Sequence, residues 1–194
     1  MPYSKEHKQQ SREKILQSAS ELFPRKGYEA VSIDELMIHA GLTRGAFYSH
    51  FSDKSEIYAE SIIYTATRSP IVLENSDTTD ISEWFDNTIG QYLSPSHVTT
   101  QPSPCPLAFL VTDINKREKK VRNSYTQVYK SLLSFLNRRF KSHSVEIKNE
   151  TTMTISAIMI GGVALANALD DKKLADKLLR SCRKISKDLI KIDA

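Results

Sequence analysis

Apolar residues recur at intervals of three and four along most of this 194-residue chain, and this spacing constrains the fold more than any other feature. Such spacing predicts helices, because residues three or four apart lie on one helical face. No segment shows the apolar–polar alternation of a half-buried strand. Gly and Pro are sparse, at 6 and 7 residues, whereas proteins dominated by strands and turns usually contain more. The sequence therefore predicts an all-α protein of eight or nine helices.

The N-terminal helices have recognisable start and stop residues. The first is expected over 11–23, with Ile15, Leu16, Ala19, Leu22 and Phe23 inward, and is expected to end early at Pro24, before Gly27. The sequence "SIDE" at 32–35 predicts a capping box and a second helix, and Gly41 predicts a left-handed turn residue after it. A third helix is expected over 43–51, and a fourth after Asp53.

Further helices are expected over 80–93, 107–116, 121–140, 149–169 and 172–192. The polar stretch 69–79 predicts a linker or loop, and residues 94–106, which contain four prolines, predict a long loop. A division near residues 65–75 follows from this change in composition. We expect an N-terminal domain over 1–60, with a connecting helix to about residue 68, and a C-terminal domain over 69–194.

Composition and charge favour a soluble protein in the cytoplasm. The net charge is +4, but residues 1–60 sum to −1, with eight Lys and Arg against nine acids, so the positive excess lies mostly in 172–194. Binding to an anionic partner must therefore be argued from individual cations. The N-terminus lacks the pattern of a secretory signal, and the apolar run 155–169 is short for a membrane span. The two cysteines and five histidines have no metal-ligand spacing, so no metal or cofactor is expected.

Motifs of common enzyme classes are absent from the sequence. The chain has no Gly-rich phosphate loop, no H-E-x-x-H and no nucleophile elbow. S-x-x-K occurs at 11–14 and 181–184, without the partner motifs that would make it catalytic. A helical enzyme therefore stays an unlikely alternative.

The segment 40–58, "AGLTRGAFYSHFSDKSEIY", has the residue types that a DNA-contacting helix needs. A helix, a turn with glycine and a second short helix predict a helix-turn-helix, whose second helix enters the major groove. Arg44 can bond to guanine, whereas hydroxyls, His50 and Lys54 can reach phosphates. Small residues permit close approach of the backbone, and Phe47 and Phe51 are expected to anchor the helix in the core. The predicted DNA-binding residues are Ser32, Thr43, Arg44, Gly45, Ala46, Tyr48, His50 and Lys54.

Residues 11–60 resemble the N-terminal domain of the TetR/AcrR family of transcriptional regulators. The most specific matches are Ala40-Gly41, Gly45, Phe47-Tyr48, Phe51 and Lys54, whereas Pro24 and Met37 depart from the common pattern. The resemblance implies that the short helix contacts DNA, that Lys54 contacts a phosphate, and that the C-terminal domain binds a ligand and forms a homodimer. Its expected function is that of a ligand-responsive repressor, released from a palindromic operator by a small, mostly apolar effector. An activator and a regulator that answers a protein partner stay open as alternatives.

Two sets of C-terminal residues follow from the same resemblance. Segment 105–122 is similar to a "GCPLA…VR" stretch of one branch of the family, with Pro104 in place of glycine. The aromatic residues that can line an effector pocket, or else form ordinary core, are Trp84, Phe85, Tyr92, Phe109, Tyr125 and Tyr129. The residues expected at the dimer interface, on apolar stripes of the last two helices, are Ile158, Gly161, Leu165, Leu178, Cys182 and Ile185. Whether Cys105 senses redox change is left open.

Overall fold

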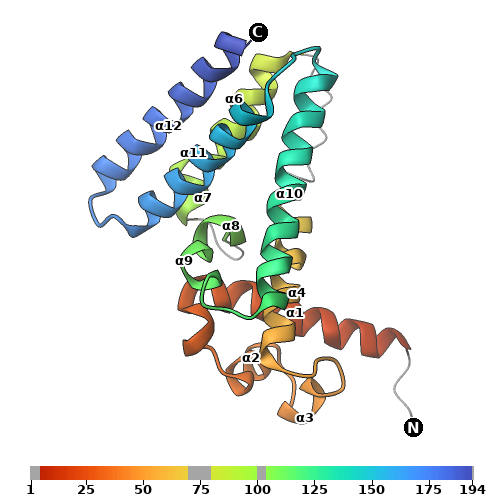
Figure 1. The fold of residues 1–194 in the computed structure, drawn as a ribbon. Helices are drawn as coiled ribbons and strands as arrows, with labels where there is room; N and C mark the ends of the chain where they lie inside the picture. Colours follow the sequence, from red (N-terminus) through yellow and green to blue (C-terminus); the bar gives the residue numbers. More distant parts are fainter. Residues whose placement is uncertain (1–4, 70–79, 100–103, 194) are drawn as a thin grey trace. The chain divides into compact units, whose positions relative to one another are not determined.

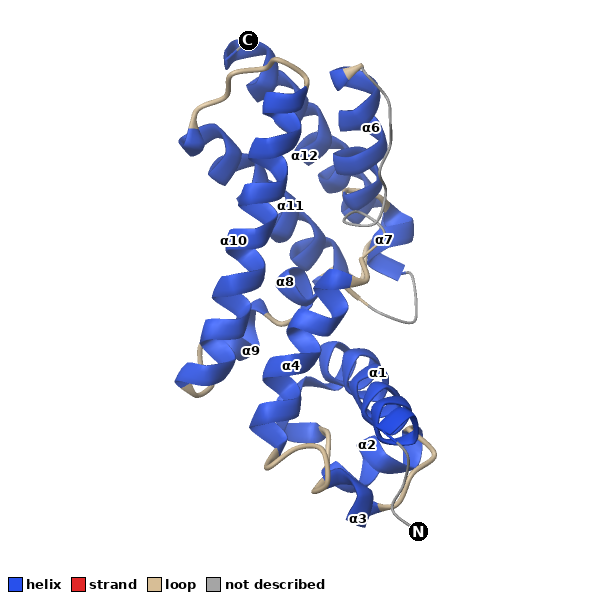
Figure 2. Ribbon diagram, turned by 90° about the vertical axis from the view of Figure 1, so that its right-hand side faces the viewer, coloured by secondary structure: helices blue, strands red, loops and turns tan. Residues whose placement is uncertain are grey.

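The computed structural model describes residues 5–69, 80–99 and 104–193, and every regular element in these ranges is a helix (Figure 2). This confirms the predicted all-α class. Backbone packing divides the chain into two compact units. We call Met1–Arg68 with Gln101–Val128 the N-terminal unit, and Ser69–Thr100 with Tyr129–Ala194 the C-terminal unit. These units follow packing rather than function, so the functional division at residues 60–69 stays a prediction.

The N-terminal unit contains α1 (Lys5–Ala30), α2 (Ile33–His39), α3 (Arg44–Phe47), α4 (Lys54–Thr67), α8 (Pro106–Phe109) and α9 (Val111–Ile114). It also includes the first part of α10 (Lys119–Ser142), up to Val128; Figure 1 labels these helices and colours them along the sequence. Helix α1 packs on α4 and α2, and α2 packs on α3. Between these helices lie the fully buried side chains of Ile15, Phe23, Leu36, Phe47 and Tyr58.

Helix α1 is longer than predicted, and Pro24 does not end it. Helical geometry continues through Pro24, and the interruption falls at Gly27, whose φ of 77° is left-handed. Proline costs this helix one backbone hydrogen bond. The neighbouring Phe23 compensates, because its ring is buried against Tyr28 and Tyr58, with ring centroids 6.1 and 4.5 Å away. The predicted early end at Pro24 was therefore wrong, whereas Gly27 does mark the break.

Helix α3 is shorter than the predicted 43–51. It spans four residues, Arg44–Phe47, and the chain continues in turns to Phe51. The amide groups of His50 and Phe51 both donate to the carbonyl of Phe47, which closes this turn. Phe47 and Phe51 are buried as expected, at 0% and 2% exposure. The turn is thus held by its two aromatic anchors rather than by helical propensity.

The C-terminal unit contains α6 (Ile81–Tyr92), α7 (Pro95–Thr99), α11 (Asn149–Ala168), α12 (Lys172–Asp193) and the remainder of α10. Helices α11 and α12 pack on one another. Residues 95–99, predicted as loop, form α7, because Pro95 suits the first turn of a helix. The predicted helix 107–116 is instead two single turns, α8 and α9, and the predicted linker 69–79 lies almost wholly outside the described residues.

Helix α11 is long and apolar enough to pass for a membrane span by length and composition, contrary to the expectation from residues 155–169 alone. One face of this helix packs inside the C-terminal unit. Ile155, Met159 and Val163 are fully buried, and the hydroxyl of Ser156 bonds with that of Tyr129 at 3.0 Å. Trp84 of α6 fills the same unit, packing edge-on to Phe140 with ring centroids 5.5 Å apart.

Candidate nucleic-acid interface

Helix α2, the turn at Gly41 and helix α3 form a compact helix-turn-helix. The Ser32 hydroxyl accepts from the Glu35 amide at 3.0 Å, and the Glu35 carboxylate accepts from the Ser32 amide, so the predicted capping box is confirmed. Gly41 adopts φ 67°, the left-handed conformation that glycine tolerates best. The chain thereby turns directly from the end of α2 to Arg44 at the start of α3.

Polar groups at the start and end of α3 are exposed. Thr43 occupies the N-cap position, but its hydroxyl makes no capping bond. Tyr48 is 57% exposed, while its ring packs edge-on to the buried Phe47 at a centroid separation of 5.3 Å. Neither hydroxyl has a hydrogen-bond partner within the described part of the chain. Both are therefore available to phosphate oxygens.

Gly45 and Ala46 leave one part of the α3 surface without large side chains. Gly45 is exposed, and a Cβ added there would meet no atom within 4 Å. Its φ does not lie in the left-handed region, so neither packing nor backbone strain inside the chain requires glycine. Glycine also weakens a helix relative to alanine. Close approach of another molecule is the remaining physical reason for a glycine here.

Arg44 is exposed, but its guanidinium is already paired. Nη1 donates to Oδ2 of Asp34 on α2 at 2.5 Å, and the side chains are 59% and 52% exposed. An ion pair this exposed contributes little to stability. The contact uses Nη1 alone, so the other N–H groups of the guanidinium can reach a base edge.

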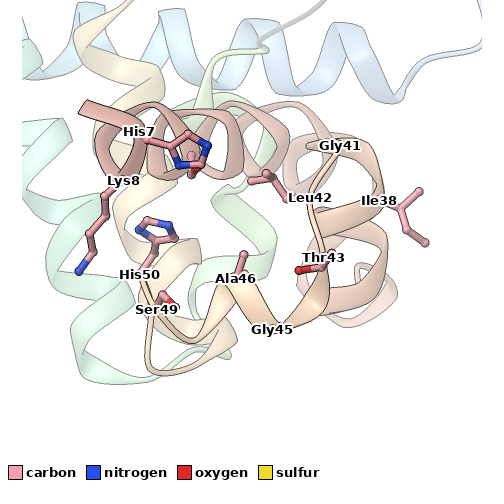
Figure 3. Close-up of a pocket in the computed structure, with 11 residues that line it drawn as sticks. His7, Lys8, Ile38, Gly41, Leu42, Thr43, Gly45, Ala46, Ser49 and His50 are labelled. Atoms are coloured by element: carbon pink, nitrogen blue, oxygen red, sulfur yellow. The ribbon is translucent and has the colours of Figure 1, made fainter. Parts of the chain in front are cut away.

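His50 is partly buried, in a pocket beside α3. The pocket has a volume of about 920 Å³ and lies between the first turns of α1 and the α3 turn (Figure 3). Its lining includes four predicted DNA-binding residues, Thr43, Gly45, Ala46 and His50, together with His7 and Lys8 of α1. Burial, with the charges of Lys8 and Arg12, lowers the pKa of His50. Its Nδ1 is buried and has no hydrogen-bond partner among the described residues.

Lys54 begins α4 as expected, but its ammonium lies against an aromatic ring. Nζ is 4.3 Å from the ring centroid of Tyr28, and the Arg117 guanidinium carbon is 4.4 Å from the same centroid. Burial lowers the pKa of Lys54, the nearby Glu29 opposes this effect, and Arg117 adds to it. The lysine is thus held at the N-terminus of α4 in a partly buried position, from which its ammonium can extend to a phosphate.

A polar network joins α4 to residues 113–120 inside the N-terminal unit. The buried Tyr58 donates to Asp113 at 2.6 Å, and burial followed by this bond raises the pKa of Tyr58. Arg117 bonds to Asp113 at 3.1 Å and to Glu29 at 2.5 Å. Lys120 contacts both carboxylate oxygens of Asp53, the cap of α4, at 2.8 and 2.9 Å. Residues 113–120 therefore contact the helix that follows the helix-turn-helix.

The predicted effector-binding residues are divided between the two units. Trp84, Phe85 and Tyr92 are buried on α6, and Tyr129 lies in the same C-terminal unit. Phe109 and Tyr125 belong to the N-terminal unit, where the Tyr125 hydroxyl donates to the Leu107 carbonyl at 2.6 Å. Their role in effector binding stays a prediction.

The predicted dimer residues fall into outward and inward positions. Leu165 and Ile185 are 57% and 51% exposed, and a Cβ at Gly161 would meet nothing within 4 Å. Ile158 and Leu178 are partly exposed. Cys182 packs inside the chain, because a Cβ on Gly162 would lie 3.1 Å from its Sγ, and burial raises the pKa of this thiol.

Sequence reasoning missed Asp34, Tyr28 and Arg117. Tyr28 and Arg117 lie 89 positions apart by their residue numbers, and no local pattern connects them. Asp34 could have been found, because an acid in the first turn of α2 that is not part of the capping box is free to contact α3. The pocket residues His7 and Lys8 carry no such pattern.

Together the three-helix packing, the glycine turn and the exposed, small-surfaced α3 define a helix-turn-helix DNA-binding protein. Comparison with known proteins gives the family. Residues 15–60 match the family model described as bacterial regulatory proteins, tetR family. Residues 15–60 are thus a TetR-family segment, and the relatives that match most of the chain are transcriptional regulators rather than enzymes.

Similar proteins extend the match over most of the chain. The uncharacterized HTH-type transcriptional regulator YxaF of Bacillus subtilis is 26% identical over 84% of this chain and 87% of its own length. The HTH-type transcriptional repressor BepR of Brucella suis is 29% identical over 91% of this chain and 89% of its own. A TetR-family regulator from Agrobacterium tumefaciens has the same fold, with a TM-score of 0.74 at 20% identity, covering 91% of this chain and 97% of its own.

Proposed function

We propose that the protein is a ligand-responsive repressor that binds a palindromic operator as a homodimer and is released by a small, mostly apolar effector. The exposed α3 is the observation that carries the proposal. The aromatic anchors of the α3 turn, Phe47 and Phe51, are buried in the described structure. Thr43, Gly45 and Tyr48, by contrast, face outward. A repressor, BepR, is among the relatives that match nearly the full length of the chain.

Dimerisation is supported by apolar surface on α11 and α12. Leu165, Leu174 and Ile185 are each about half exposed, as is Met153 on α11. Exposed apolar residues on two adjacent helices favour self-association through a four-helix interface. Two copies of α3 would then reach successive major grooves, about 34–36 Å apart.

Release by an effector is supported by the network on α4. A ligand that binds one arrangement of residues 113–120 better than another would shift these residues. The shift would reach α4 through the Tyr58–Asp113 hydrogen bond and the contact of Lys120 with Asp53. The connecting helix 57–68 then passes this change to the DNA-binding elements. A differential affinity of about 1.4 kcal/mol gives a tenfold loss of DNA binding. We expect the protein to be cytoplasmic, because its operator DNA is accessible there.

An activator is the second candidate. The HTH-type transcriptional activator FasR of Mycolicibacterium smegmatis is 43% identical over 47 residues, which is 24% of this chain. A match over so small a share of the chain does not separate a repressor from an activator. A reporter gene placed behind the operator distinguishes the two, since a repressor lowers its expression and an activator raises it.

The test begins with duplexes selected by the protein from a random library. Arg44→Ala should weaken binding to the selected operator by about 1–3 kcal/mol and to random duplex much less, because base contacts distinguish sequences. Lys54→Ala should weaken both similarly and lower the salt slope by about one, as expected for a phosphate contact. Equal losses on both duplexes for Arg44→Ala would assign Arg44 to the backbone instead. Failure to enrich any sequence would contradict operator binding.

A further inference from the structure

We infer that Asp34 is a specificity-determining residue, which positions Arg44 for base contact and restrains it from binding phosphates indiscriminately. The inference rests on the proposed DNA-binding function. Asp34 lies in the first turn of α2, and Arg44 is the first residue of α3. The 2.5 Å contact between Oδ2 and Nη1 joins the two helices of the helix-turn-helix on an exposed face.

The two neighbouring acids of α2 have different tasks. Glu35 accepts from the Ser32 amide and forms an ion pair with Lys26, which lowers the pKa of its carboxyl. Asp34 takes no part in this capping box, and Arg44 is its hydrogen-bond partner among the described residues. The negative charge of Asp34 also stabilises α2, because it lies near the positive end of the helix dipole. The experiment must therefore separate helix stabilisation from an effect on Arg44.

The chemistry of arginine explains how a carboxylate can raise specificity. The guanidinium has five N–H groups in one plane, and Asp34 engages Nη1. The Nε–Nη2 edge stays free for the two-point contact that guanine O6 and N7 accept. A phosphate accepts from arginine in many orientations and responds mainly to charge. A carboxylate that fixes the plane and offsets the charge thus favours guanine and disfavours phosphate.

Through Arg44, Asp34 also opposes non-specific binding, because its negative charge reduces the attraction between the guanidinium and phosphates. Specificity is a difference between two affinities, and a repulsive group can increase it. Since the pair is exposed, each effect should be modest, at most about fivefold in affinity. Removing the charge should therefore tighten binding to random DNA while giving no gain on the operator.

The experiment measures dissociation constants for the selected operator and for random duplex over a range of salt concentrations. The proteins are wild type, Asp34→Asn, Arg44→Ala, the double variant, and Asp34→Glu, which retains the charge. The matched control is Asp86→Asn, since Asp86 is also 52% exposed and pairs with Lys187 at 2.7 Å, but on α6. Thermal melts confirm that each variant is folded at the temperature of measurement.

For Asp34→Asn we expect random duplex to bind up to about fivefold more tightly, with a salt slope steeper by about one. The ratio of operator to random affinity should fall about fivefold, and Asp34→Glu should restore most of it. In the Arg44→Ala background, Asp34→Asn should leave the ratio of operator affinity to random-duplex affinity unchanged. Asp86→Asn should alter neither affinity.

An unchanged ratio in Asp34→Asn would overturn the inference. A fall of equal size in the Arg44→Ala background would also overturn it, because Asp34 would then act without Arg44. If Arg44→Ala itself left the ratio intact, the base-contacting role of Arg44 in the proposed function would fail first. A loss of ratio with Arg44→Ala but not with Asp34→Asn would reject the role of Asp34 alone.

Discussion

Gly41 and Gly45 lie on either side of the start of α3, and different physical reasons explain the two residues. Gly41 has φ 67°, so any side chain there would strain the backbone. Gly45 has helical backbone geometry and open space around its missing Cβ. Glycine at 41 is therefore explained by folding. Glycine at 45 lowers helix stability without any internal benefit, which indicates a function outside the chain.

Gly45→Ala should stabilise the protein and impair its function. We expect unfolding to require roughly 0.5–1 kcal/mol more free energy, because alanine costs less entropy in a helix. Operator binding should weaken about tenfold, or about 1.4 kcal/mol, as the new methyl obstructs the backbone's approach. Chemical denaturation and binding titrations measure the two effects. Gly41→Ala is the control, since it should lower stability; undiminished operator binding by Gly45→Ala would remove this reason for glycine.

At the residue scale, the sequence predicted the exposed residues of α3 better than their partners. Thr43 and Tyr48 are exposed because the buried Phe47 fixes the orientation of the turn, and the aromatic pattern shows this. The Asp34–Arg44 pair and the position of Lys54 over Tyr28 depend on how separate helices approach one another. A helical pattern gives the face of each residue but not the crossing of two helices.

At the element scale, long amphipathic helices were predicted closely and short ones were not. Helices α11 and α12 begin at Asn149 and Lys172, the residues at which the pattern begins. By contrast, α7, α8 and α9 span four or five residues, too few for helical periodicity to be visible. Helix α1 was predicted too short, because the burial of Phe23 overrides the tendency of Pro24 to end a helix.

Helix α7 should make stability depend on pH through His97. Burial lowers the pKa of His97 to about 4, and its ring lies 4.5 Å from that of Tyr92 on α6. An unfolded histidine, with a pKa near 6.5, binds a proton that the folded state excludes between pH 6.5 and 4. Stability is thus complete above pH 6.5 and falls as the pH is lowered toward 4, by roughly 3 kcal/mol for this group.

Urea unfolding at pH 7 and pH 4.5, at one protein concentration, measures this contribution. The difference between wild type and His97→Gln should shrink or reverse as the pH falls, because glutamine cannot take up the proton. Other acidic and histidine residues titrate alike in both proteins and cancel in this comparison. Parallel stability curves for the two proteins would show that His97 does not control the acid response of α7.

At the scale of the whole molecule, the sequence predicted the all-α class and the family resemblance, whereas its functional division at residues 60–69 stays a prediction. Residues 104–128 belong to the same compact unit as helices α1 to α4, although the sequence placed them in the C-terminal domain. Their contacts to α4 are made by Asp113, Arg117 and Lys120, which no local motif marks. A division based on composition detects linkers, but it does not detect packing between distant segments.

Gly161→Asp should produce folded monomers that lose operator binding. The substitution fits the isolated chain, because no atom lies within 4 Å of the added Cβ, but it would place a charge on the apolar stripe of α11. Sedimentation should show a shift from dimer to monomer, with an unchanged helical circular dichroism spectrum. Asn167→Asp adds the same charge at an exposed position off this stripe and should stay dimeric. A dimeric Gly161→Asp would place the interface elsewhere.

The spacing of the half-sites in the selected operator tests the central claim most directly, since two recognition helices held by one dimer must contact one face of the duplex. Selection from random duplexes, followed by sequencing, measures this spacing. For a dimer we expect an inverted repeat whose half-site centres lie about one helical turn, or a whole multiple of it, apart. Enrichment of a single unrepeated site, or of inverted repeats with no fixed spacing, would contradict the proposal that a dimer binds through paired α3 helices.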